Sequence, residues 1–266
     1  MVLSSVKPAK SINQAKEVKV ESAFPIMISN PKFEDYNGQA MVTLSYDDGL
    51  NDNYELALPI HEKYSIPATF NIIGQRVIIK SFHKDFFNPF KVKDAERRGV
   101  EIAAHSYYHD IGLIDKTDEE VHFEFGETKK VLSMWCIGSP ETYAVQFSKY
   151  DDRVRSIGMQ YYKGIRVHGN AQNNTPPNDR YWINSAIAVT NTTTFSDVKE
   201  KIDEAIENRQ WCVIMLHGID PKKDGLYEIT PSLLEEILQY INTQGREKIL
   251  PVCTRDALKF TLGNQY

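Results

Sequence analysis

Two short polar motifs in the first half of the chain have the residue types that hold a metal ion. The first is Ser-Tyr-Asp-Asp-Gly at residues 45–49, which follows the apolar run at residues 40–44. Two adjacent carboxylates at the end of a buried strand repel each other and are costly to desolvate unless a cation compensates them. The motif therefore indicates a positively charged partner, although Asp-Asp-Gly is also an ordinary turn sequence.

The second motif is His-Ser-Tyr-Tyr-His at residues 105–109, directly after the apolar run at residues 100–104. Two histidines four positions apart point the same way if the backbone turns helically, and they can then grip one metal ion. Together the two motifs supply one carboxylate and two imidazoles, with coordination positions left open for water and substrate. This set is more specific than either motif alone.

A third feature is the apolar run at residues 211–216, which ends in His217. A histidine where a buried strand emerges is either a satisfied core residue or a functional one. At the carboxyl end of a parallel strand it stands where barrel enzymes carry catalytic groups. Given the other two motifs, we favour a catalytic role for His217.

The elements that must position these residues follow a repeating pattern from residue 40 onward. Short apolar or β-branched runs alternate with helical segments, which predicts βα units and a largely parallel sheet, either a barrel or an open doubly wound sheet. Ser196, followed by Asp197 and Glu200, indicates one helix start, and Thr230 before Pro231 indicates another. The strands are expected at residues 40–46, 68–73, 100–104, 164–167, 211–216 and 249–252, and the clearest helices at residues 118–132, 196–208 and 231–243.

Residues 1–38 are polar, contain three prolines and have no sustained hydrophobic period, so they are interpreted as an N-terminal extension with one short apolar strand near residues 24–28. Residues 39–266 are expected to form one domain, because no repeat, low-complexity tract or linker divides them. The three cysteines are far apart in the sequence and lie in or beside apolar runs, which indicates buried, reduced thiols.

The composition excludes some function classes. Hydrophobic residues make up 41% and charged residues 25%, the balance of a globular protein. A net charge of -5 gives no cationic field for nucleic acid, and no segment is long and apolar enough to span a membrane. No signal peptide is visible, so the expected location is the cytoplasm, or outside the cell if a leader has been removed. The sequence indicates no oligomeric state.

The three motifs, in this order, resemble those of the polysaccharide deacetylases with a NodB-homology domain, carbohydrate esterase family 4. The resemblance covers residues 40 to about 260 and implies an α/β fold, a distorted (β/α) barrel. It also implies a metal site made by Asp48, His105 and His109, with Asp47 as the catalytic base and His217 as the general acid.

The activity implied by this resemblance is hydrolysis of an N-acetyl group on a sugar or glycan. One divalent metal activates a water, Asp47 takes its proton and His217 protonates the leaving amine. Zinc is the default metal, and the same donors accept cobalt, manganese, nickel or iron. The alternatives are an O-acetyl esterase, a deformylase or a cyclic-amide hydrolase on the same site, or a catalytically silent glycan-binding relative.

The chain departs from the family in two motifs. The third motif normally has an arginine two residues before a proline, with an oxyanion-binding amide just after it. Its best match is residues 138–141, with Pro140 and Glu141 but no arginine, and Arg166 is the candidate replacement that orients Asp47. The fourth motif, an aspartate and a tryptophan that support the catalytic histidine, is loosely matched by Asp179 and Trp182. His61, His83 and His122 have no supporting pattern and are expected at the surface.

Overall fold

The computed structural model describes residues 27–79 and 85–266. Of the strand expected near residues 24–28, only Met27 and Ile28 are described, and neither is in a strand. The boundary between residues 38 and 39 stays a prediction. None of the described helices is long and apolar enough to cross a membrane.

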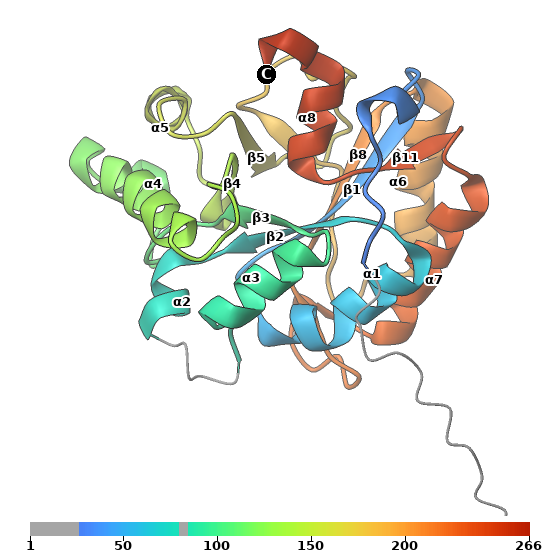
Figure 1. Ribbon diagram of the computed structural model, residues 1–266, viewed down its shortest axis with the longest axis horizontal. Coiled ribbons are helices and arrows are strands. Elements are labelled where there is room, and N and C mark those ends of the chain that lie inside the picture. Colours follow the sequence, from blue (N-terminus) through green and yellow to red (C-terminus); the bar gives the residue numbers. More distant parts are fainter. Residues whose placement is uncertain (1–26, 80–84) are drawn as a thin grey trace, which may run out of the picture.

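Helices alternate with mostly parallel strands along the chain, as the sequence pattern predicts (Figure 1). The strands are β1 (Ala40–Tyr46), β2 (Ala68–Ile72), β3 (Glu101–Ala104), β4 (Thr142–Ala144), β5 (Gly164–His168), β6 (Ile183–Ser185), β7 (Ile187–Ala188), β8 (Trp211–Leu216), β9 (Gly218–Ile219), β10 (Glu228–Ile229) and β11 (Ile249–Pro251). The longer helices are α1 (Leu58–Tyr64), α2 (Gly74–Ile79), α3 (Pro89–Arg97), α4 (Asp118–Ser133), α5 (Asp152–Gly158), α6 (Phe195–Asn208), α7 (Pro231–Gln244) and α8 (Thr254–Leu262). Short helical turns are η1 (Phe33–Asp35), η2 (Asn53–Ala57), η3 (Leu113–Asp115), η4 (Gln146–Ser148) and η5 (Gly263–Gln265).

The main sheet is a nearly closed parallel barrel with the strand order β6-β5-β4-β3-β2-β1-β8-β7. Its ends meet through one continuous segment, because β6 pairs with β5 while β7, two residues further on, pairs with β8. β11 pairs with residues 40–42 of β1 and β2 pairs with residues 44–46, both on the edge opposite β8. β11 therefore lies between the starts of β1 and β2, which distorts the barrel as expected.

β1 is the centre of this arrangement. All seven of its residues are buried, and neighbouring strands bond to both of its edges. This explains its nearly continuous apolar sequence, which is typical of a parallel strand covered on both faces. Its polar Thr43 is satisfied inside the core, where its hydroxyl donates to the Val252 carbonyl at 2.8 Å and accepts from Trp211 Nε1 at 2.9 Å.

The strands and helices predicted from residue 40 onward are present, with end points that differ by no more than one residue. The helix cap predicted at Ser196 is wrong. The cap of α6 is Thr194, which exchanges hydrogen bonds with Asp197. The start predicted at Thr230 is confirmed, since its hydroxyl accepts from Leu233 N and Pro231 is the first helical residue. The described chain also contains elements that the sequence pattern did not predict, notably β4, β6 and β7.

The expectation that His61 lies at the surface is wrong. Its side chain is fully buried, its Nδ1 lies 2.9 Å from the Ile66 carbonyl and its Nε2 lies 2.8 Å from the Tyr46 hydroxyl. Because a carbonyl only accepts, Nδ1 carries the proton and Nε2 accepts from Tyr46. Burial lowers the pKa of His61 to about 4, against a smaller opposing effect of the Ile66 carbonyl. His122 is partly buried, and His83 lies outside the described residues.

The cysteines agree with the expectation of reduced thiols, but only two of the three are buried as expected. All three are free, with Cys212 and Cys253 buried and Cys136 partly exposed.

Candidate metal and catalytic site

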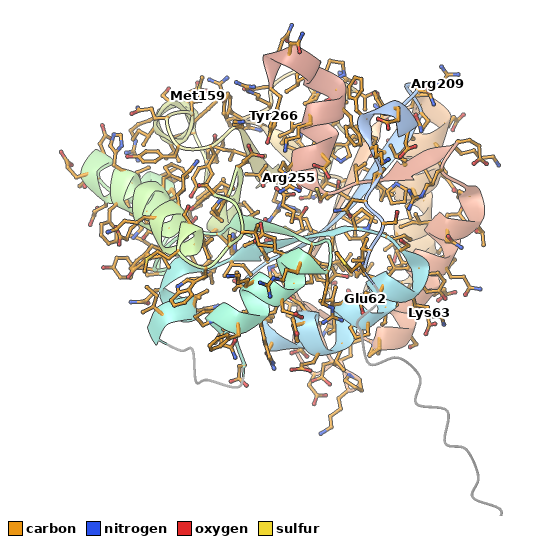
Figure 2. The ribbon with its side chains drawn as sticks, in the orientation of Figure 1. Glu62, Lys63, Met159, Arg209, Arg255 and Tyr266 are labelled. Carbon is orange, nitrogen blue, oxygen red and sulfur yellow. The ribbon has the colours of Figure 1, made fainter. Side chains whose placement is uncertain are left out.

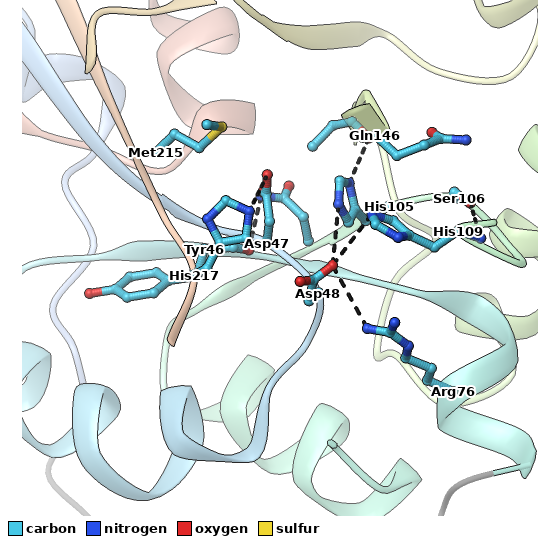
Figure 3. A network of polar contacts seen from close by, with 12 residues as sticks. Tyr46, Asp47, Asp48, Arg76, His105, Ser106, His109, Gln146, Met215 and His217 are labelled. Atoms are coloured by element: carbon cyan, nitrogen blue, oxygen red, sulfur yellow. Dashed lines mark hydrogen bonds and ion pairs between the residues drawn. The ribbon is translucent and has the colours of Figure 1, made fainter. Parts of the chain in front are cut away.

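The sequence-predicted site residues come together at one end of the barrel, where the parallel strands finish. Asp47 and Asp48 follow β1, His105 follows β3 and His217 follows β8, while Arg166 points inward from β5. Figure 3 shows the carboxylates of Asp47 and Asp48 and the imidazoles that follow β3 and β8 directed toward one another. The carboxyl ends of barrel strands are where such folds carry catalytic side chains.

Asp48, His105 and His109 form a candidate metal centre. One ligand atom from each residue lies within 4.8 Å of the other two. Asp48 Oδ1 is 3.7 Å from His105 Nε2 and 3.5 Å from His109 Nε2, and this buried oxygen has no hydrogen-bond partner within the described chain. A buried carboxylate oxygen without a partner is costly, whereas a divalent ion between the three atoms would satisfy it. The donor set therefore fits a metal ion.

Both imidazoles are prepared to act as ligands. His105 Nδ1 lies 2.9 Å from the Ala144 carbonyl, so Nδ1 carries the proton and the Nε2 lone pair faces Asp48. The pKa of each histidine is lowered to about 4, in both cases first by burial, and for His109 next by Arg76. At neutral pH both rings are therefore uncharged, which is the form that binds a metal.

The loop that carries the two histidines differs from the expected helical turn. Ser106 has φ 66° and His109 has φ 56°, so two non-glycine residues adopt left-handed backbone conformations, and Asp48 does the same with φ 75°. Residues other than glycine rarely adopt this region, and such strain is concentrated at functional sites. The two rings still meet, with centroids 4.9 Å apart.

Glu124 of α4 holds this loop, a role that the sequence analysis missed. Its Oε2 accepts hydrogen bonds from Ser106 Oγ at 2.9 Å and from the backbone N–H groups of Tyr107 at 2.6 Å and Tyr108 at 3.2 Å. Ser106 Oγ in turn accepts from His109 N at 2.8 Å. The available signal was a carboxylate on the apolar face of a predicted helix, one residue before the buried Phe125.

Asp47 is buried and strongly bound on the other side of the site. Arg166 Nη2 donates to both of its carboxylate oxygens, at 2.5 and 2.6 Å, and Asn71 Nδ2 donates to Oδ1 at 2.8 Å. Burial by itself would raise the pKa of Asp47, but the charge of Arg166, with smaller effects of His105 and His217, lowers it to about 2. Asp47 is therefore ionised at neutral pH. The structure thus brings Arg166 to the carboxylate that it was expected to orient.

His217 completes the cluster but is held differently from His105. Its Nε2 lies 3.9 Å from Asp47 Oδ2, and its ring lies against Tyr227 with centroids 4.8 Å apart. Its buried Nδ1 has no hydrogen-bond partner among the described residues. Asn53 Nδ2 donates to the His217 carbonyl at 2.7 Å and fixes the backbone.

Pro140 and Glu141 are not part of the site, so their predicted oxyanion and substrate role is corrected. They precede β4 and therefore lie at the amino ends of the strands, opposite the metal centre. Glu141 is bound there by Lys163 at 3.0 Å, Lys259 at 3.2 Å and the Tyr266 hydroxyl at 3.1 Å. Figure 2 shows Tyr266 beside α8, at the C-terminal end of the chain.

Asp179 and Trp182 are also misassigned, because they precede β6 and cannot support His217, which follows β8. Asp179 Oδ2 accepts from Arg155 Nε at 2.7 Å, and Trp182 packs against Tyr150 with ring centroids 5.0 Å apart. Both contacts are structural and lie at the amino end of the barrel. The residues that do approach the metal centre after β4 include Phe147, whose ring centroid is 4.6 Å from that of His109.

Comparisons with known proteins agree with this geometry. Residues 34–162 match the family model described as polysaccharide deacetylase, a range that contains Asp47, Asp48, His105 and His109. The chain is 31% identical over 117 residues to chitin deacetylase 1 of Cryptococcus neoformans, which is 44% of this chain and 23% of that protein. The chain thus matches about a quarter of the length of this relative.

Solved structures with the same fold cover most of the chain. A family 4 acetyl xylan esterase from Clostridium thermocellum in complex with a cobalt ion has a TM-score of 0.60 at 18% identity, over 82% of this chain and 90% of that one. Peptidoglycan deacetylase PdaC from Bacillus subtilis has a TM-score of 0.54 at 16% identity, over 86% and 96%. At these identities the similarity shows the fold. Together with the family match over residues 34–162, it shows that the chain has the fold of these proteins and that its first half is similar to the polysaccharide deacetylase family.

Proposed function

We propose that the protein is a metal-dependent hydrolase that removes N-acetyl groups from a carbohydrate. The observation that carries this proposal is the convergence of Asp48, His105 and His109 around a buried carboxylate oxygen that has no hydrogen-bond partner in the described chain. The match of residues 34–162 to the polysaccharide deacetylase family supports the carbohydrate substrate, and the likeness to a chitin deacetylase supports an amide rather than an ester bond.

The residues around the metal centre divide the chemistry between them. A divalent ion bound there would polarise the acyl carbonyl and lower the pKa of a water. Asp47, ionised and fixed by Arg166 and Asn71, accepts the proton of the attacking water. The charge of Arg166 lowers the pKa of Asp47, so this carboxylate is ionised and able to accept the proton. His217 Nε2, 3.9 Å from Asp47 Oδ2, is placed to protonate the departing amine nitrogen.

We further propose zinc as the natural metal. Two imidazoles and one carboxylate form a typical zinc donor set with open positions, and they also accept cobalt, manganese, nickel or iron. The related acetyl xylan esterase was solved with cobalt, which supports a divalent ion at such a site without deciding between these metals.

The test is acetate release by protein that is stripped of metal and then reloaded with zinc or cobalt, on N-acetylated chitin oligosaccharides and on O-acetylated xylan. We expect release from the N-acetylated sugars only after reloading, and its loss together with bound metal in His109→Ala. His122→Ala is the matched control, because that imidazole bonds to Tyr161 outside the site. Acetate from the ester alone would make the protein an esterase, and glycan binding without any acetate would make it a silent relative.

A further inference from the structure

Arg76 of α2 lies at the edge of the metal centre in a fixed position. The first turn of α2 is bound to the histidine loop, because Gly74 N donates to the Ser106 carbonyl and Gln75 N to the Tyr107 carbonyl, both at 3.0 Å. The approach is close, since a Cβ on Gly74 would lie 3.1 Å from a ring carbon of Tyr107. The helix therefore cannot shift independently of the loop that carries His105 and His109.

The guanidinium of Arg76 has no hydrogen-bonded anion in the described part of the chain. Its carbon lies 4.4 Å from the ring centroid of Phe86, and its Nη1 lies 3.8 Å from Asp48 Oδ1, beyond hydrogen-bond distance. The side chain is 24% exposed. Figure 3 shows it directed at Asp48.

The other cations around the site differ from Arg76. Arg166 donates to both oxygens of Asp47, and Lys116 pairs with Asp110 at 2.7 Å and with Glu124 at 2.9 Å. Each has a carboxylate of its own. The carboxylate that faces Arg76 belongs instead to the candidate metal centre, so its charge is shared with the ion that the three ligands fit.

We propose that Arg76 is a specificity-determining residue that binds an anionic group, a carboxylate or a phosphate, carried by the substrate near the acetyl group that is cleaved. This rests on the proposed deacetylase function. A guanidinium offers a planar fork of N–H donors that matches these two groups, and its partly buried position beside the metal centre strengthens the interaction. Stacking on Phe86 holds the fork open toward the site.

The experiment measures binding by calorimetry to the zinc-loaded protein, in a His217→Ala background that slows turnover. The probes are an N-acetylated disaccharide with a uronic acid carboxylate, the same sugar as its neutral methyl ester, and an N-acetylhexosamine phosphate beside its unphosphorylated form. We expect at least one anionic probe to bind roughly tenfold more tightly than its neutral partner, since hydrogen bonds to charged groups are the stronger ones. The probe pair that shows the preference tells whether the anionic group bound by Arg76 is a carboxylate or a phosphate.

Adding Arg76→Gln should reduce that ratio to about one, and Arg76→Lys should retain part of it because it keeps the charge. Arg97→Gln, which removes an exposed arginine at the end of α3, is the control and should leave the ratio unchanged. Equal binding of the charged and neutral probes, or a preference that survives Arg76→Gln, would overturn the proposal. Acetate release from neutral sugars by the unmodified protein is measured separately, so failure of the deacetylase function is recognised on its own.

Discussion

His105 and His217 both follow buried parallel strands, yet the protein holds their imidazoles in different ways. The Nδ1 of His105 bonds to a backbone carbonyl, and its loop is tied to Glu124 through three hydrogen bonds. The ring of His217 is held by packing against Tyr227, and its Nδ1 has no partner among the described residues. The first arrangement fixes one tautomer, as a metal ligand requires, whereas no hydrogen bond among the described residues fixes the Nδ1 of His217.

Of the substitutions considered that keep the metal ligands, removal of the His217 imidazole should lower catalysis the most. If its imidazole protonates the leaving amine, His217→Ala lowers kcat about 10²–10⁴-fold on an N-acetylated sugar, with unchanged bound metal. The loss on an O-acetyl ester should be smaller, because an alkoxide leaves with less need for a proton. An equal loss on amide and ester, measured as acetate release at saturating substrate, would remove His217 from the role of acid.

The next largest effect is expected for Arg166 of β5, because this arginine donates hydrogen bonds to both carboxylate oxygens of Asp47. Arg166→Met leaves a buried carboxylate unpaired and should lower the free energy of unfolding by roughly 3–5 kcal/mol. It should also raise the pKa of Asp47, which the Arg166 charge now lowers to about 2. The acid limb of the pH–rate profile then moves to higher pH. An unchanged limb and unchanged urea unfolding would contradict the assignment, and Arg166→Lys, which keeps the charge, should show a smaller shift.

A substitution at Glu124 tests how the loop that carries His105 is held. Glu124→Gln removes a charged acceptor from the N–H groups of the histidine loop, and we expect metal affinity to fall roughly 10–100-fold, as for other partners that support ligands. Glu119→Gln, on the exposed face of the same helix, should leave affinity unchanged. Competition with a chelator measures both. Equal affinity in wild type and Glu124→Gln would show that the loop holds its shape without this carboxylate.

The smallest expected effect concerns His61, a third imidazole, which is buried between α1 and β1 with both ring nitrogens bonded. The pKa of His61 in the folded protein, about 4, lies below the ordinary 6.5. As the pH falls, the unfolded chain therefore binds a proton at this imidazole before the folded protein does. Its contribution to stability is present above pH 6.5 and is lost as the pH falls toward 4. Urea unfolding at pH 7 and pH 5 should show a smaller pH dependence in His61→Gln than in wild type. The same pH dependence in both would mean that folding does not lower the pKa of His61.

The sequence predicts the metal side well because the relevant signals are local. Asp48, His105 and His109 stand next to apolar runs, and parallel strands bring their ends to one edge. Arg166 could be proposed for the same reason, since it lies near the end of a predicted strand. Glu124 and Asn71 could not be assigned from sequence, because their roles depend on which loop or carboxylate packs against them.

The wrong assignments share one cause. Pro140, Glu141, Asp179 and Trp182 were matched by residue type without the direction of the strands that follow them. β4 and β6 are only three residues long, so no hydrophobic run marked them, and the four residues turned out to precede a strand instead of following one. A position before a parallel strand lies at the amino end of the barrel, opposite the catalytic edge.

The metal centre is tested by acetate release from an N-acetylated oligosaccharide, measured with metal-stripped protein before and after one equivalent of zinc. We expect no release before addition, activity after it, and neither activity nor bound zinc in Asp48→Ala. Activity in the stripped protein, or zinc-dependent activity that survives Asp48→Ala, would contradict a metal centre built on Asp48, His105 and His109.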